Sequence, residues 1–384
     1  MNTSGIISLP EWLTISKITN KIISMNLLVD CHVFDGKFQG TRTYLEGLYQ
    51  NMVLHKDIIF FFAAKDVDSL RKVFGNGENI HYIMLKHSDS IGRLTGDFPK
   101  IIKENNIDYA HFQYISPFKK TCKEIDTIHD LLFMDFPQYF SIGYKLKNEF
   151  FFKRSAKRAD IVLTVSEYSQ ERINHWFNIP KDNIYITENA VLPINKDILI
   201  PDIKYRYGLD KYILTVSRIE PRKNHLMLLE AFVEKRLYER GYDLVMVGTP
   251  DLKYKSFQLY LNNLSESIKE HIKILAVPFP DLVGLYQKAS LFVFPSLAEG
   301  FGIPPLEAIE YGCPILCSNA TAMKEFDLPD EVTFDPTNIE EMETKIEKQL
   351  ANPVRIDKDE MIKKFNWKHS ADVLYNAIVD NSHL

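Results

Sequence analysis

Short apolar runs alternate with longer segments of helical periodicity along most of the chain, beginning at residue 27. This rhythm is typical of parallel β-sheets that helices cover on both faces. The first series of expected strands comprises residues 27–30, 58–62, 82–85, 109–112, 125–128, 161–165 and 183–186. The second series comprises residues 212–216, 243–247, 272–276, 291–294 and 314–318. The pattern therefore predicts an α/β protein with two doubly wound, Rossmann-like domains that face a central cleft.

The boundary between the two series falls around Pro193 to Pro201, where polar residues and two prolines form a natural linker. We therefore expect an N-terminal domain over residues 25–194 and a second domain over residues 202–365. A length of 384 residues agrees with more than one domain. Open sheets bind ligands at the carboxyl ends of their strands, so two facing domains predict a cleft between those ends.

Residues 1–24 form a leader extension before the first strand. Pro10, Glu11 and Lys17 interrupt its apolar residues, which fits neither a signal peptide nor a membrane span. The leader could be a surface extension, or it could result from a translation start assigned upstream of the true start. A short amphipathic helix is a further alternative, and it would hold a membrane only weakly.

Composition narrows the choice of partners. Hydrophobic residues make up 45% and charged residues 25% of the chain, as in soluble globular proteins, and the net charge is −5. An acidic balance argues against nucleic acid as the main partner. Four scattered cysteines provide no disulfide framework and no zinc-finger spacing, which indicates a reducing cytoplasm.

The most informative stretch, residues 291–324, reads as strand, glycine-rich turn, short helix and strand. Pro304 and Pro305 suit the first turn of a helix, and the backbone N–H groups around Gly302 would face the sheet edge. Such a helix start favours an anion, and diphosphate fits. Glu299 and Glu307 make most sense there as acceptors for hydroxyl groups, although Glu307 could instead be only a favourable charge in the first helical turn.

Two motifs, EGFGIPPLE at residues 299–307 and SRIEPRKN at residues 217–224, resemble the signatures of retaining GT-B glycosyltransferases of the family 4 type. The resemblance implies that Glu299 contacts the donor sugar and Glu307 the ribose, while Arg218 and Lys223 bind the diphosphate. For Arg218 alone, a surface salt bridge is the alternative. The resemblance also implies further donor-binding residues, namely Gly300, Phe301, Gly302, Ile303, Gly248 and Val277.

The N-terminal half offers candidates for the acceptor side. Gly40 and Arg42 open a helix after the first strand and resemble the loop that faces the reacting sugar in this family. His129 and Asp130 follow another strand and resemble the acceptor-side pair, where the histidine could orient or deprotonate a hydroxyl group. A hydrogen-bonded histidine beside a helix-capping aspartate is the structural alternative. His111, at a neighbouring strand end, could line the acceptor pocket.

The segment 145–158 combines six basic residues with three phenylalanines. This composition suits a surface that touches anionic lipid head groups, but a solvated helix whose phenylalanines pack inward has the same composition. Residues 366–384 form a terminal amphipathic helix. By resemblance, this helix would cross back onto the N-terminal domain.

Together the motifs predict transfer of a sugar from a nucleotide sugar with retention of anomeric configuration. Arg218, Lys223 and helix N–H groups would stabilise the leaving diphosphate, so we expect no cofactor and no catalytic metal. The resemblance makes GDP-mannose the first choice of donor. A glycan or lipid-linked glycan of surface polysaccharide assembly is the expected acceptor, at the inner face of the membrane. A nucleotide-sugar epimerase or hydrolase of the same fold, or a non-catalytic glycosyltransferase partner, remain alternatives.

Overall fold

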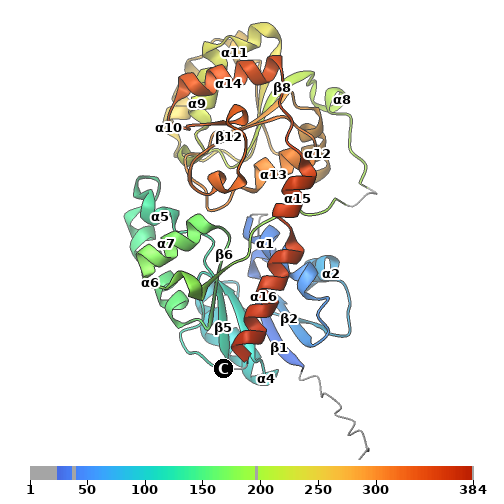
Figure 1. Ribbon diagram of the computed structural model, residues 1–384, viewed down its shortest axis with the longest axis vertical. Coiled ribbons are helices and arrows are strands. Elements are labelled where there is room, and N and C mark those ends of the chain that lie inside the picture. Colours follow the sequence, from blue (N-terminus) through green and yellow to red (C-terminus); the bar gives the residue numbers. More distant parts are fainter. Residues whose placement is uncertain (1–23, 37–39, 195–197, 383–384) are drawn as a thin grey trace, which may run out of the picture.

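The structure is a computed structural model that describes residues 24–36, 40–194 and 198–382. All but the last residue of the expected leader lies outside these ranges, as does the middle of the expected linker. Two α/β bodies follow one another along the long axis of the molecule, and the C-terminal helix runs from the upper body down the lower one (Figure 1).

The N-terminal domain is built on a parallel sheet of seven strands in the order β3-β2-β1-β4-β5-β6-β7. Alternate side chains of its strands face opposite layers, because neighbouring residues of a strand point to opposite sides. Leu27 and Val29 pack towards α1 (Gly40–Met52) and α16 (Trp367–Ser382), whereas Leu28 packs towards α4 (Phe98–Glu104). The strands are β1 (Met25–Asp30), β2 (Ile58–Ala64), β3 (Ile80–Met84), β4 (Tyr109–Gln113), β5 (Lys123–Thr127), β6 (Ile161–Thr164) and β7 (Ile184–Ile186).

Helices cover both faces of this sheet (Figure 1). Several have side-chain caps at their N-termini; Ser141 caps α6 and Ser166 caps α7, each accepting a backbone N–H of the first turn. The helices are α1 (Gly40–Met52), α2 (Val67–Phe74), α3 (Ser90–Gly92), α4 (Phe98–Glu104), α5 (Leu132–Asp135), α6 (Ile142–Arg158) and α7 (Glu167–Phe177).

The C-terminal domain repeats this plan with a parallel sheet of six strands in the order β10-β9-β8-β11-β12-β13. The expected α/β architecture and its strands are confirmed, within a few residues at their ends. The last strand, β13, escaped the sequence pattern because it has only two residues. The strands are β8 (Lys211–Val216), β9 (Tyr242–Val247), β10 (Ile272–Leu275), β11 (Leu291–Phe294), β12 (Ile315–Ser318) and β13 (Thr333–Phe334).

The helices of the C-terminal domain lie on both sides of its sheet, and the last two lead back towards the first domain (Figure 1). They are α8 (Ile203–Tyr207), α9 (His225–Glu234), α10 (Lys255–Asn263), α11 (Glu266–Lys269), α12 (Phe279–Lys288), α13 (Ile303–Glu310), α14 (Ile339–Ala351), α15 (Lys358–Lys364) and α16 (Trp367–Ser382).

Helix α16 lies on the N-terminal domain. The Tyr375 hydroxyl donates to Asp57 at 2.7 Å, and the Tyr109 hydroxyl donates to the Asn381 side chain at 2.9 Å. The Ser370 hydroxyl donates to the Glu188 carbonyl oxygen at 2.7 Å. These bonds tie the end of the chain to the first domain.

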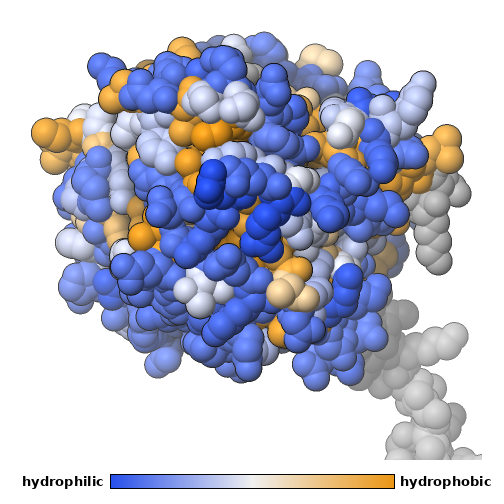
Figure 2. All heavy atoms as spheres, turned by 90° about the horizontal axis from the view of Figure 1, so that it is seen from above, coloured by the Kyte–Doolittle hydropathy of each residue, from blue (hydrophilic) through white to orange (hydrophobic). Residues whose placement is uncertain are grey.

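In each sheet the order of the strands reverses once. The reversal lies between β1 and β4 in the first sheet and between β8 and β11 in the second. A doubly wound sheet binds its ligand at such a point, beyond the carboxyl ends of the strands. Seen from above, over the C-terminal domain, the surface is mostly hydrophilic with hydrophobic side chains in small separate groups (Figure 2). No helix within the described ranges is long and apolar enough to cross a membrane.

Candidate active site

The glycine-rich loop between β11 and α13 lies at the point where the strand order of the second sheet reverses. Gly302 precedes the helix with φ +102°, a backbone conformation that residues other than glycine rarely adopt. Pro304 and Pro305 then lie in the first turn of α13, where their missing N–H groups cost nothing. The glycine and the two prolines therefore set the start of α13 shortly after Glu299.

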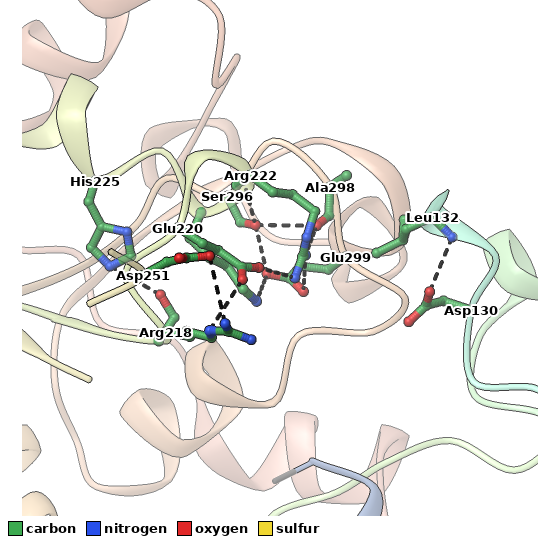
Figure 3. A network of polar contacts seen from close by, with 12 residues as sticks. Asp130, Leu132, Arg218, Glu220, Arg222, His225, Asp251, Ser296, Ala298 and Glu299 are labelled. Atoms are coloured by element: carbon green, nitrogen blue, oxygen red, sulfur yellow. Dashed lines mark hydrogen bonds and ion pairs between the residues drawn. The ribbon is translucent and has the colours of Figure 1, made fainter. Parts of the chain in front are cut away.

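Glu299 is surrounded by groups that stabilise its charge. Its Oε1 pairs with Lys223 Nζ and accepts from Ser296 Oγ at 2.6 Å, while Oε2 lies 3.1 Å from Arg222 Nη1 (Figure 3). Burial alone would raise the pKa of Glu299, but the charges of Lys223 and Arg222 lower it to about 2. Glu299 is therefore a carboxylate throughout the physiological pH range.

Arg222, which lies within the SRIEPRKN motif, also belongs to this site. Its guanidinium donates to Glu299, to the Ala298 carbonyl oxygen and to Glu220, the last at 2.8 Å. The burial and the double carboxylate contact of Arg222 have no signature in a single sequence. Its position directly before Lys223 was the available hint.

Arg218 lies beside the cluster and is the more exposed of the two arginines. Its side chain is 65% exposed and pairs loosely with Glu220 and Asp251, at 3.7 Å in each case (Figure 3). Arg218 follows β8 at the sheet edge and has room to turn towards a ligand. Its assignment to the diphosphate stays a prediction.

The glycine-rich loop touches the N-terminal domain at Gly300. A Cβ atom on Gly300 would lie 2.6 Å from Asp130 Cβ, closer than such atoms approach one another. The Gly300 carbonyl oxygen accepts from Ser166 Oγ at 2.6 Å, at the start of α7. Glycine at this position therefore lets the two domains close against each other.

Asp130 and the His129 carbonyl oxygen thus lie against Gly300 of the glycine-rich loop. The assignment of both residues to the acceptor side stays a prediction. Asp130 accepts the Leu132 N–H at 3.1 Å and lies on the opposing loop from the Glu299 cluster (Figure 3). Burial lowers the pKa of His129 to about 3. The ring is therefore uncharged at neutral pH.

The tautomer of His129 follows from its partner. Its Nε2 lies 2.7 Å from Gln113 Oε1, which can only accept, so Nε2 carries the proton. Nδ1 is then a hydrogen-bond acceptor. A basicity this low favours an orienting role over proton removal.

His111 lies within the sheet instead of on an open wall. Its side chain is fully buried, with Nδ1 2.6 Å from the Tyr49 hydroxyl and Nε2 2.7 Å from Thr127 Oγ1. Burial lowers the pKa of His111 to about 3. The structure gives it a supporting place behind His129, which differs from the expected contact with an acceptor.

Glu307 lies in α13, one side of which packs against α12. The hydroxyl of Tyr286, a fully buried residue of α12, donates to Glu307 Oε2 at 2.9 Å. Burial raises the pKa of Glu307, and the Tyr286 hydrogen bond opposes that rise. The sequence gave no sign of this partner, because the two residues meet only through the packing of the helices.

The remaining predicted residues fall into three groups. Phe301 packs against Phe326 and Phe365, with ring centroids 5.5 Å apart in each pair, so its ring belongs to the core. Ile303 begins α13, while Gly248 and Val277 follow β9 and β10 at the same sheet edge. Gly40 begins α1, and the Arg42 guanidinium lies over the Phe34 ring at 4.7 Å.

The described part of the chain contains no group of three or more histidine, cysteine, aspartate or glutamate side chains arranged to hold a metal ion. The charged groups that converge on Glu299 are instead cationic side chains.

Two family models match the chain, one for each domain. The model described as Glycosyltransferase Family 4 matches residues 43–192, and the model described as Glycosyl transferases group 1 matches residues 200–368. Each model covers one of the two domains that the structure shows.

Among proteins of similar sequence, O-antigen chain mannosyltransferase B of Escherichia coli is 30% identical over 63% of this chain and 66% of its own. Serotype-specific mannosyltransferase WbdA of the same species is 28% identical over 66% of this chain and 32% of its own. This chain therefore spans less than two thirds of the length of each. Sucrose-phosphate synthase from Thermosynechococcus elongatus has a similar fold, with a TM-score of 0.73 and 16% identity over 93% of this chain and 99% of its own.

Proposed function

The chain belongs to the GT-B glycosyltransferases of the family 4 type, and on that basis we propose that it moves a sugar from a nucleotide sugar to a glycan with retention of anomeric configuration. The observation that carries the proposal is Glu299, which Arg222 and Lys223 keep ionised where the two domains meet. A buried carboxylate held in this way can accept hydrogen bonds from the hydroxyl groups of a sugar without taking up a proton.

The leaving group is a nucleoside diphosphate, on which negative charge grows as the bond to the anomeric carbon breaks. The groups that would stabilise that charge are Lys223, Arg218 and the backbone N–H groups of Gly302 and Ile303, which precede the two prolines of α13. These groups can do the electrostatic work of a divalent ion. We therefore propose a reaction that needs no metal.

Mannose from GDP-mannose is the proposed donor. The two mannosyltransferases of similar sequence support this choice, and the name of one of them, O-antigen chain mannosyltransferase B, refers to the O-antigen chain. The proposed acceptor is accordingly a glycan or lipid-linked glycan of surface polysaccharide, at the cytoplasmic face of the membrane.

The donor can be tested by thermal shift with GDP, UDP, dTDP and their sugars. A ligand that binds only the folded state raises the melting temperature by mass action. We expect GDP and GDP-mannose to produce the largest rise in the parent and a smaller one in Glu307→Gln. No rise with any nucleotide would contradict the proposed function, and a rise with UDP or dTDP alone would replace the donor.

Membrane contact is the second part of the proposal, and one face of α6 supports it. Ile142, Leu146 and Phe150 follow one another at intervals of four residues, so they form one stripe along the helix. Their exposed fractions are 80%, 63% and 62%. Phe118, 54% exposed, lies beside this end of the domain.

The charges around the stripe fit an anionic lipid surface. Lys119, Lys147 and Lys157 are exposed on the same helix or the adjoining loop. Other residues of the segment have structural roles instead: Arg154 donates to the Phe118 carbonyl oxygen, and Phe152 is buried.

Sedimentation with vesicles tests this contact. We expect the parent to bind phosphatidylglycerol vesicles more than phosphatidylcholine vesicles, and Leu146→Glu with Phe150→Glu to abolish the binding. Leu252→Glu with Leu259→Glu, on the exposed surface of the C-terminal domain, is the matched control. Equal binding by both double variants would remove α6 from the proposal.

A further inference from the structure

A cavity of about 450 Å³ opens between the two domains beside the Glu299 loop. One wall belongs to the N-terminal domain and carries Phe136, Gln138 and Tyr139. The other wall is formed by the segments that follow β11, β12 and β13. Its residues include Leu297, Asn319, Thr321, Lys324 and Asp335.

The second wall is part of the structure that holds Glu299. Thr321 Oγ1 accepts the Glu299 N–H at 2.8 Å. Thr321 has φ +50°, a left-handed conformation that is strained for a β-branched residue. Next to Lys223, the Asn224 side chain donates to the carbonyl oxygen of Pro336 at 2.9 Å. The cavity and the charged cluster therefore share one framework.

Strand order places the cavity on one side of Glu299. Val277, Gly248 and Arg218 follow β10, β9 and β8, which form one half of the sheet. Glu299 follows β11 at the centre. Asn319 and Asp335 follow β12 and β13, which form the other half. A donor whose nucleotide lies over the first half would present its sugar at Glu299, with the cavity immediately beyond.

The lining of the cavity suits an uncharged sugar. The Asp335 carboxylate accepts from the N–H and hydroxyl of Thr337 at 2.8 and 2.7 Å, and these bonds lower its pKa. Asp335 is therefore an ionised acceptor, near the ammonium donor Lys324 and the carboxamide of Asn319. Sugar hydroxyl groups both donate and accept hydrogen bonds. The C–H face of a pyranose ring can pack on aromatic rings such as Phe136 and Tyr139.

We propose that this cavity binds the neutral terminal sugar of the acceptor, so that the acceptor crosses from the N-terminal domain to β12 and β13. The assignment rests on the proposed function, because it takes Glu299 as the point of transfer. A diphosphate fits the cavity less well, since Asp335 would repel it. The volume lies within the range of small-molecule sites.

The test is saturation-transfer difference NMR on the full chain with GDP in excess. The probes are methyl α-mannoside, methyl α-glucoside and N-acetylglucosamine. The variants are Tyr139→Ala and Asn319→Ala, and the control is Leu252→Ala, whose side chain is 84% exposed and lies outside the cavity. We expect at least one probe to bind the parent and the control equally. Its affinity should fall at least about tenfold in both cavity variants.

Calorimetric titration of GDP into the same proteins separates this inference from the proposed function. We expect GDP affinity to remain at the parent value in both cavity variants. Binding of no probe by the parent, or undiminished binding in the cavity variants, would overturn the subsite even where GDP binds normally. Failure of the parent to bind any nucleotide would instead contradict the proposed function.

Discussion

Glu299 remains ionised in a buried place because two cations and a hydroxyl group surround it. Lys223 cannot at once hold Glu299 and make full contact with a diphosphate. The proposed function requires Lys223 to turn towards the phosphates of a bound donor, and the Arg222 bond to Glu299 would then remain. This division of labour gives Arg222 a positioning role that the motif alone did not reveal.

The first prediction concerns these two cations. Lys223→Ala should lower kcat by about 10² to 10³, the usual effect of removing one preorganised charge-stabilising donor. Arg222→Met should also slow transfer and, because it removes one charge that lowers the pKa of Glu299, should move the acid limb of the pH–rate profile to higher pH. Steady-state rates from pH 8 down into the acid limb, together with a fluorescence check at each pH that the protein stays folded, supply the measurement.

Arg236→Met is the control, since this arginine lies elsewhere on the surface and pairs with Glu239, three residues further along the chain. It should leave both the rate and the profile unchanged. An unchanged acid limb in Arg222→Met would mean that Arg222 does not stabilise the carboxylate.

The second prediction separates the two glutamates. Glu307→Gln should weaken free nucleoside diphosphate and nucleotide sugar alike, because both carry the ribose that Glu307 is expected to contact. Tyr286→Phe should weaken both to a smaller degree with little change in kcat, since Tyr286 only orients Glu307. Glu299→Gln should preserve diphosphate affinity and lower kcat, as expected for a contact that strengthens in the transition state.

Calorimetric titration of the free diphosphate into the three variants provides the comparison. Equal weakening in Glu299→Gln and Glu307→Gln would show that the two roles are not separate.

At the scale of elements, the loop before α13 and the start of α7 form the joint between the domains. Ser166 caps α7 and also donates to the Gly300 carbonyl oxygen. Glu325 of the C-terminal domain accepts the N–H groups of Glu167 and Tyr168, at 2.9 and 2.7 Å, where the helix dipole favours a negative charge. Domain closure thus uses the backbone N–H groups at the start of a helix and a glycine.

The third prediction follows from this joint. Gly300→Ala should hold the domains apart, because the new Cβ would meet Asp130 at 2.6 Å. We expect transfer to fall sharply while free diphosphate keeps its affinity, since the groups expected to bind it lie in one domain. Gly143→Ala is the control, because a Cβ there would have nothing within 4 Å. Full transfer activity in Gly300→Ala would show that closure at Gly300 is not required.

Most strands could be predicted from sequence because each is a buried apolar run bounded by turn residues. The glycine-rich loop could also be predicted, since Gly302, Pro304 and Pro305 have conformational preferences that suit a turn and a helix start. The roles of Arg222, Tyr286 and Thr321 could not be predicted, because they come from contacts between segments far apart in the chain. His111 looked like a pocket residue only because its burial behind Gln113 and Thr127 cannot be read from one strand.

For the molecule as a whole, three buried histidines link folding to pH. His111, His129 and His225 each have a pKa lowered by burial to about 3. The unfolded chain, with histidine pKa values near 6.5, binds more protons than the folded chain between these two values. These three histidines therefore do not reduce the free energy of unfolding above about pH 6.5, and they lower it progressively as the pH falls towards 3.

The fourth prediction uses His225, which is buried in the C-terminal domain and lies 3.2 Å from Ser217 Oγ. Between pH 7.5 and pH 5.5, one such histidine should cost about 1.4 kcal/mol of unfolding free energy. His225→Gln should lose that share of the pH dependence, whatever its effect at pH 7.5. Urea titrations of parent and variant at both pH values provide the measurement, and an equal pH dependence in both would contradict it.

The two domains, the cationic cluster and the cavity beyond it all serve one reaction in this proposal, which is sugar transfer from a nucleotide sugar with retained configuration. The most direct measurement is proton NMR of the purified full chain in EDTA, with GDP-mannose, UDP-glucose or dTDP-rhamnose and neutral sugar glycosides as acceptors. We expect the anomeric signal of one donor to be replaced by that of a glycoside of the same configuration, most rapidly with GDP-mannose, and Glu299→Gln to suppress the change. An epimerised nucleotide sugar, a glycoside of inverted configuration, or no glycoside from any donor would contradict it.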